Sequence, residues 1–330
     1  MLFEVSGLSV EYSTLNEVSR AVNDVHLSVG RGEVVGIVGE SGCGKSTLAL
    51  ALLGLTRRNA AITAGSVTLD GQALVGGGLS EKQLRQVRGR RIGLITQNAR
   101  SSLNPTVRIG KQIATVFALH TGERGAQARA AAISALRLVG INDPERRFDA
   151  YPHELSGGMA QRAVIAMATV CRPDVVIADE ATSRLDVTIQ AQILDDLQRA
   201  VQEVGSSLVL ITQDLGVIAN YADRLYVMNA GEVVETAPTP LLFEAPGHPA
   251  SVSLLESQLD HSDREFGLRG LPVDGRDLPE GCWLQARCPF VDDQSGCRIV
   301  HPELADVGGG HQVRCHRTSV VVGRTAELAR

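Results

Sequence analysis

The sequence predicts an α/β fold around a mainly parallel sheet, with an antiparallel β edge, an inserted helical subdomain and a small cysteine-rich C-terminal extension. Apolar runs alternate with helical segments, which is typical of a parallel sheet. Residues 98–160 are rich in alanine and helical in period, and proline, glycine and polar residues increase over 238–330. We therefore expect the core in residues 1–97 and 161–237, the helical subdomain in 98–160 and the extension in 238–330.

The individual elements follow from the periodicity of apolar residues along the chain. Residues 1–12 alternate between apolar and polar side chains, which predicts an edge strand. Residues 33–38 form a short apolar run that predicts a buried strand, and the helix after it is expected over residues 46–55. Further strands are expected at residues 66–69, 92–95, 175–178, 208–212 and 225–228, and a further helix at residues 126–139.

Bulk composition narrows the possible functions of this 330-residue chain. An apolar content of 44% supports a sizeable core, while a formal net charge of −5 and 3% aromatic residues argue against broad nucleic-acid binding. No apolar run approaches the ~18–20 residues needed to span a bilayer. The first residues lack a charged leader followed by an apolar stretch. We expect a soluble, cytoplasmic protein that acts at a membrane only through partner subunits.

A phosphate-binding motif, GESGCGKS, occupies residues 39–46. Backbone N–H groups beside a helix N-terminus can donate to phosphate oxygens, and glycines let the chain approach them closely. Lys45 is expected to reach the β- and γ-phosphates, and the Ser46 hydroxyl to ligate Mg²⁺. The candidate ATP-binding residues of this loop are Gly39, Ser41, Gly42, Cys43, Gly44, Lys45, Ser46 and Thr47.

Two carboxylates end the apolar strand expected at residues 175–178, in the sequence VVIADE. Asp179 is expected to contact Mg²⁺ through water. Glu180 follows immediately and would polarise the attacking water as general base. Together these residues predict a site that hydrolyses a nucleoside triphosphate.

The segment LSGGMAQR at residues 155–162 separates this chain from other phosphate-loop proteins. The phosphate loop, the Ser-Gly-Gly helix start and the strand ending in Asp-Glu, in that order, resemble the ATPase subunit of an ABC transporter. The resemblance implies a P-loop NTPase core that binds ATP and Mg²⁺ and dimerises head to tail with a second ABC ATPase subunit. It also implies a signature motif acting on the partner's ATP, made of Leu155, Ser156, Gly157, Gly158 and Met159.

The same resemblance assigns roles to residues outside these three motifs. Gln97 matches the glutamine that touches Mg²⁺ and the attacking water, and Leu185 and Asp186 match the loop that links the two sites across the dimer. Tyr12 matches the aromatic position that stacks on adenine, although a tyrosine packed on the core is the alternative.

Further segments resemble the oligopeptide, dipeptide and nickel importers within this family. These are SSLNP at residues 101–105, Met159 in the signature and LFEAPGHP at residues 242–249. With them the resemblance covers roughly residues 1–320. It implies two transmembrane permease subunits, an extracytoplasmic substrate-binding protein and a peripheral position on the cytoplasmic face of the cell membrane. The transported solute stays open.

The extension carries four of the six cysteines, Cys282, Cys288, Cys297 and Cys315, within the last 49 residues. Four thiolates suit Zn²⁺ or an iron–sulfur cluster, and the spacing alone does not choose between them. The resemblance to dipeptide-importer ATPases with such a tail implies a 4Fe–4S cluster. Zinc and cysteines without a bound group or in disulfides remain alternatives.

Several residues depart from the family pattern around the expected hydrolytic site. Gln213 stands where the family has a switch histidine, and glutamine carries no positive charge and relays no proton. Other departures nearby are Ala181, Arg184, Thr96 and Ala99. We expect an asymmetric heterodimer in which ATP at this chain's own site, with Glu180, Gln97 and Gln213, turns over slowly or stays bound. The alternatives are two competent sites, a soluble ABC protein of DNA repair or translation, or a regulator that does not hydrolyse ATP.

Overall fold

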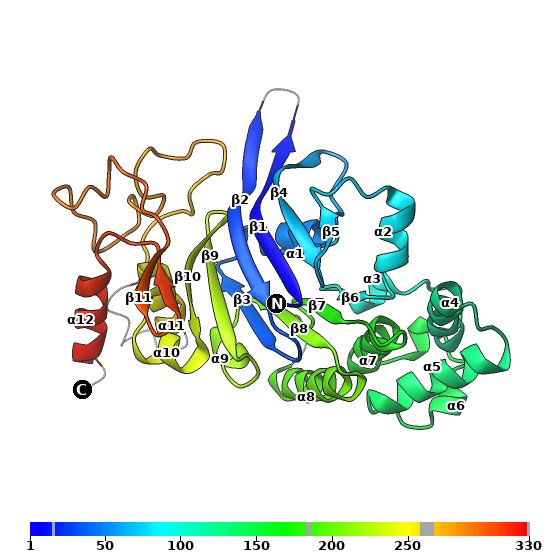
Figure 1. Ribbon diagram of the computed structural model, residues 1–330. Helices are drawn as coiled ribbons and strands as arrows, with labels where there is room; N and C mark the ends of the chain where they lie inside the picture. Colours follow the sequence, from blue (N-terminus) through cyan, green and yellow to red (C-terminus); the bar gives the residue numbers. More distant parts are fainter. Residues whose placement is uncertain (15–16, 183–185, 258–266, 329–330) are drawn as a thin grey trace. The chain divides into compact units, whose positions relative to one another are not determined.

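The computed structural model describes residues 1–14, 17–182, 186–257 and 267–328 (Figure 1). The chain divides into two compact units. The first contains Met1–Val29, Val34–Gly78 and Thr212–Arg330, and the second contains Gly30–Glu33 and Leu79–Ile211. Among the described helices, none has the length and apolar character that a membrane crossing requires.

An antiparallel sheet forms one part of the first unit, with strand order β2-β1-β4-β5. Strand β1 lies between β2 and β4, and its Phe3 is opposite Val29 of β2 and Leu69 of β4. Its apolar residues alternate with polar ones and bury one face, as the alternation of residues 1–12 predicts. The prediction that this is an edge strand is wrong, because β1 pairs with β2 on one side and with β4 on the other. The bounds are β1 Phe3–Ser13, β2 Val18–Val29, β4 Ala60–Leu69 and β5 Gln72–Val75.

The first unit also contains the fully buried strand β3, Val34–Gly39. It pairs in parallel with β9, Arg224–Asn229, and β9 pairs antiparallel with β10, Glu232–Pro238. The hairpin of β11, Ala305–Gly308, and β12, His311–Val313, continues this sheet beyond β10. The helices of this unit are α1 Lys45–Ala51, α9 Leu215–Ile218, α10 Thr239–Glu244, α11 Pro249–Glu256 and α12 Thr318–Leu328.

The second unit holds a parallel arrangement of β6, Ile92–Ile95, β7, Val175–Asp179, and β8, Ser207–Thr212. Both faces of β7 are buried, which explains its continuous apolar sequence. The helices are α2 Glu81–Val87, α3 Ala99–Ser102, α4 Ile109–Thr121, α5 Ala126–Leu138, α6 Pro144–Arg147, α7 Gly157–Thr169 and α8 Val187–Val204, with a short 3₁₀ turn at Pro152–Glu154.

Small side chains explain how the helices between β6 and β7 pack. Ala128, Ala132 and Ala135 follow helical spacing on α5 and are buried, and α5 contacts α4, α6 and α7 (Figure 1). Gly110 lets α4 approach closely, because a Cβ at this position would lie 2.0 Å from a ring carbon of Phe148. The expected α/β class, with a parallel sheet and an antiparallel sheet, is confirmed. The proposed boundaries at residues 98, 160 and 238 stay predictions.

A buried carboxylate anchors the C-terminal extension to β10. Glu235 has no exposed surface, and it accepts hydrogen bonds from the backbone N–H groups of Gly247 (2.7 Å) and His248 (2.9 Å). The Ser251 hydroxyl (2.5 Å) and His311 Nε2 (2.7 Å) complete its contacts. A buried charge is costly without such partners, so the fold keeps these contacts together. Through them Glu235 connects β10 to α11 and β12.

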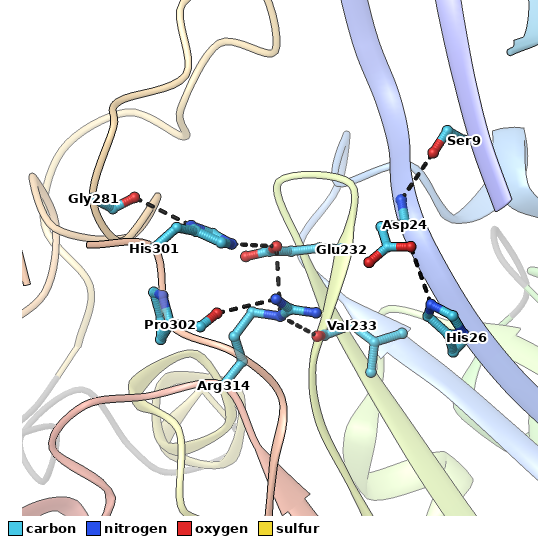
Figure 2. Close-up of polar contacts among 9 residues, drawn as sticks. All are labelled: Ser9, Asp24, His26, Glu232, Val233, Gly281, His301, Pro302 and Arg314. Atoms are coloured by element: carbon cyan, nitrogen blue, oxygen red, sulfur yellow. Dashed lines mark hydrogen bonds and ion pairs between the residues drawn. The ribbon is translucent and has the colours of Figure 1, made fainter. Parts of the chain in front are cut away.

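A second carboxylate on β10, Glu232, connects to another part of the extension (Figure 2). His301 Nε2 lies 2.9 Å from Glu232 Oε2, and its Nδ1 lies 3.2 Å from the carbonyl oxygen of Gly281. The Arg314 guanidinium lies 3.5 Å from the same carboxylate and also donates to the carbonyl of Val233. Burial lowers the pKa of His301, but the hydrogen bond and charge of Glu232 outweigh it and leave this pKa above its ordinary value.

This ion pair predicts a pH-dependent stability. Its contribution is complete below the pKa of histidine in the unfolded chain, about 6.5, and is lost as the pH rises through the higher pKa of folded His301. His301→Gln should therefore destabilise the chain most at mildly acidic pH and least near pH 8 in unfolding titrations. His316→Gln, which changes an exposed histidine, is the matched control. A His301→Gln effect that is constant across this range contradicts the assignment.

Candidate nucleotide-binding site

The phosphate loop connects β3 to α1, and its backbone passes very close to neighbouring strands. Gly44 precedes α1 with a φ of 109°. A Cβ on Gly44 would lie 2.2 Å from the carbonyl oxygen of Ala21, and a Cβ on Gly39 would lie 2.3 Å from that of Met228. Side chains cannot occupy these positions, so glycine is required by packing as well as by backbone conformation.

Lys45 is folded back onto the phosphate loop itself. Its side chain is 4% exposed, and Nζ donates to the carbonyl oxygens of Gly39 (2.8 Å) and Glu40 (2.9 Å). The Cys43 thiol lies 3.9 Å from the same Nζ. Burial raises the pKa of Cys43 and the nearby Lys45 charge opposes this, with a net rise, so the thiol is a packing group at neutral pH.

The remaining residues assigned to the loop differ in their accessibility. Ser41, Gly42 and Ser46 are exposed. Thr47 lies on the first turn of α1, where its hydroxyl oxygen is 3.2 Å from the Tyr12 hydroxyl. Tyr12 is half-buried and therefore lies beside the helix that follows the loop. Its stacking on adenine stays a prediction.

In the second unit, the carboxyl ends of β6 and β7 bring Gln97 and Glu180 together. Gln97 Nε2 donates a hydrogen bond to Glu180 Oε2. Glu180 has a φ of 47°, an uncommon conformation for a non-glycine residue, and its N–H donates to the carbonyl oxygen of Ile211 at 2.9 Å. Asp179, the last residue of β7, is 9% exposed. Backbone strain of this kind concentrates at functional sites.

The Ser-Gly-Gly segment begins α7, as its sequence predicts. The Ser156 side chain caps the helix by accepting a 3.3 Å hydrogen bond from the N–H of Met159. Gly157 and Gly158 form the first turn, and a Cβ on Gly158 would lie 3.2 Å from Ile189 Cγ2. Leu155 is buried, whereas Ser156 and Gly157 are exposed. The start of α7 is therefore accessible at Ser156 and Gly157.

The sequence also singles out residues beyond the phosphate loop, the Gln97–Glu180 contact and the start of α7. Leu185 and Arg184 fall outside the described residues. Asp186 caps α8 by accepting from the N–H of Ile189 at 3.0 Å. Gln213 follows β8 and is exposed. Ala181 is buried at 3% exposure.

The four cysteines of the extension line one small hollow, together with Leu284 and Phe290. Burial raises the pKa of Cys282 and Cys288 to about 11 and that of Cys315 to about 12. In the part of the chain that the structure describes, no group of three or more His, Cys, Asp or Glu side chains is arranged to hold a metal ion. The structure therefore brings the four thiols to one hollow without forming a closed ion site.

Comparison with known proteins places this geometry in a family. The family model described as "ABC transporter" matches residues 22–183. The dipeptide transport ATP-binding protein DppD of Escherichia coli (strain K12) is 43% identical over 318 residues, which cover 96% of each chain. The oligopeptide transport ATP-binding protein OppD of Mycobacterium tuberculosis (strain ATCC 25618 / H37Rv) is 43% identical over 98% of this chain and 53% of its own.

A solved structure of the ATP-binding cassette MJ0796, a dimer bound to ADP and Pi in a post-hydrolysis state, matches with a TM-score of 0.64 and 26% identity. The match covers 72% of this chain and 98% of that chain. The fold and the relatives define a class, the ATPases of ABC transporters, in which ATP hydrolysis is coupled to transport. Within that class, the chain belongs to the family of ABC transporter ATP-binding proteins.

The close backbone approach at Gly44 predicts that even an alanine at this position prevents ATP binding. Gly44→Ala should displace the loop from β2 and abolish ATP binding in equilibrium titrations, since its Cβ would overlap the carbonyl of Ala21. Gly71→Ala is the matched control, because Gly71 has a φ of 75° but open space around its Cβ position. That control should cost only about 1 kcal/mol of stability and leave ATP binding intact. Normal ATP affinity in Gly44→Ala contradicts the packing argument.

Proposed function

We propose that this chain is the ATP-binding subunit of a peptide-type ABC importer. The relatives named as dipeptide and oligopeptide transport ATP-binding proteins carry this proposal, because the similarity to the first of them covers 96% of each chain. It therefore includes the C-terminal extension, which lies outside the matched ABC transporter domain at residues 22–183.

Each site residue has its own role in the proposed binding and hydrolysis of ATP. Lys45 and the backbone N–H groups of the phosphate loop would hold the phosphates, Ser46 would ligate Mg²⁺, and Asp179 would contact that ion through water. Glu180 would polarise the attacking water, and Gln97 would contact Mg²⁺ and that water. The Gln97–Glu180 hydrogen bond supports this pairing. Tyr12 stacks on adenine.

The proposed partners are supported by the signature helix and by the similarity to peptide transport ATP-binding proteins. The first turn of α7, with Ser156, Gly157 and Gly158, closes over ATP held by a second ATPase subunit, as the match to a dimeric cassette supports. Two permease subunits hold the ATPase dimer at the cytoplasmic face of the membrane. A substrate-binding protein delivers the solute from outside.

Uptake by the assembled transporter tests the importer proposal. The chain, its partner ATPase, both permeases and the binding protein are reconstituted in vesicles with ATP on the ATPase side. We expect ATP-dependent accumulation of labelled di- or oligopeptides, and none when ATP is replaced by a non-hydrolysable analogue. Purification of this chain with ribosomes or DNA, without permeases, would instead support a translation or repair factor.

Gln213 supports a finer proposal, in which this chain's own site is the slow one of an asymmetric heterodimer. Its exposed side chain can donate a hydrogen bond but cannot become positively charged. A histidine at this position can do both, and general acid–base groups commonly contribute about 10²–10⁴ in rate. The complete signature of this chain would then serve the faster site, whose ATP the partner holds.

Gln213→His tests this asymmetry directly. The complex is prepared with the partner's catalytic glutamate changed to glutamine, so that turnover reports this chain's site alone. Gln213→His should raise that turnover roughly tenfold to a hundredfold. Gln213→Ala is the matched control and should not raise it. Rapid turnover with the native Gln213, reduced in Gln213→Ala, would show two competent sites.

We propose that the four cysteines hold a 4Fe–4S cluster, with zinc as the alternative. The proposal is supported by the four thiols lining one hollow and by the preference of such clusters and of zinc for soft thiolate donors. When bound, it would supply covalent cross-links between segments of a short, core-poor extension. Iron, sulfide and zinc analysis of anaerobically purified protein distinguishes the two, and a protein with neither leaves four free thiols.

A further inference from the structure

The extension makes a direct ion pair with the phosphate loop of its own chain. Arg287 precedes Cys288, and Glu40 follows Gly39 at the start of the loop. Nη1 of Arg287 lies 2.7 Å from Glu40 Oε2, and Nη2 lies 3.0 Å from Oε1. The two residues are separated by 247 positions in the sequence.

The geometry of this pair makes it stronger than an ordinary surface contact. Two parallel N–H···O bonds join the planar guanidinium to the carboxylate, which fixes direction as well as distance. The Arg287 side chain is 9% exposed and that of Glu40 is 30% exposed, so solvent screens the pair only in part. Loss of one partner would leave the other charge partly buried and without its counterion.

Glu40 also accepts a hydrogen bond from Lys45. Its carbonyl oxygen accepts from Lys45 Nζ at 2.9 Å, while its carboxylate accepts from Arg287. The backbone and the side chain of Glu40 are thus held by two different cations. The N–H groups expected to bind phosphate belong to the residues that follow, so their positions depend on how Glu40 is held.

Arg287 is itself held by backbone contacts within the extension. Its N–H donates to the carbonyl of Leu284 at 2.9 Å, and the N–H of Cys282 donates to the carbonyl of Cys297 at 2.8 Å. The extension also contacts β2, where the N–H of Arg20 donates to the carbonyl of Gly275 at 3.0 Å. Arg287 therefore reaches the loop from a structured segment.

We propose that Arg287 is a positioning residue for the phosphate loop, acting through Glu40, so that the ATP affinity of this chain depends on its C-terminal extension. This inference rests on the proposed ATP site at the loop. Thermodynamic linkage makes the effect reciprocal: bound ATP stabilises the extension segment that carries Arg287.

A double-mutant cycle on the full chain tests the inference. Arg287→Gln and Glu40→Gln should each raise the Kd for MgATP roughly tenfold, and the double variant should be no weaker than either single one. In the assembled transporter, KM for ATP should rise while kcat changes less than twofold. Arg276→Gln is the matched control, since Arg276 pairs with Asp274 and Glu17 away from the loop. It should leave Kd unchanged.

A second readout detects the reciprocal effect and separates it from unfolding of the extension. MgATP should slow amide hydrogen exchange over residues 282–288 in the native chain, and Glu40→Gln, which leaves the extension's sequence intact, should abolish that slowing. An Arg287→Gln effect on Kd that persists unchanged in the Glu40→Gln background would overturn the inference, as would a native Kd in Arg287→Gln.

Lys45→Ala distinguishes the failure of this inference from failure of the proposed site. If Lys45→Ala abolishes MgATP binding while Arg287→Gln binds normally, the loop is the ATP site and Arg287 does not position it. If Lys45→Ala binds MgATP as well as the native chain does, the loop is not the ATP site and both proposals fail.

Discussion

The close approach of backbone to backbone at the phosphate loop is the constraint on which the candidate ATP site depends. Gly39 and Gly44 lie so near the carbonyls of Met228 and Ala21 that no Cβ fits between them. The loop therefore takes its shape from β9 on one side and β2 on the other. Lys45 then closes the loop by donating to its first two carbonyls. A preorganised loop of this kind needs little further ordering when a phosphate binds.

The sequence predicts the buried strands, the polar residues that follow them and the capped start of α7, because each depends on residues close together in the chain. Runs such as residues 175–178 predict buried strands, and a carboxylate directly after such a strand must lie at its carboxyl end. The Gln97–Glu180 contact follows from the same reasoning, because parallel strands end at the same edge. Capping by Ser156 is likewise visible in the sequence, since serine before two glycines satisfies a helix N-terminus.

Long-range polar contacts are what the sequence does not reveal. Strand β10 carries Glu232 and Glu235, which read as ordinary surface charges, yet both are buried because the extension supplies histidines, N–H groups and an arginine. The hairpin β11–β12 is equally hard to predict, because β11 is exposed throughout and gives no apolar alternation. The Arg287–Glu40 pair spans most of the chain and has no local pattern at all.

The proposed division of labour between two sites rests on Gln213, which stands where the family resemblance places a histidine, beside a complete phosphate loop and signature. Glu180→Gln in this chain alone, assayed for ATP hydrolysis and solute uptake by the assembled transporter, tests that account most directly. The account predicts turnover within about twofold of the native rate, because the partner's site performs most hydrolysis. A collapse of turnover by a hundredfold or more, in the range of losing a general base, would contradict it and make Gln213 a working substitute for histidine.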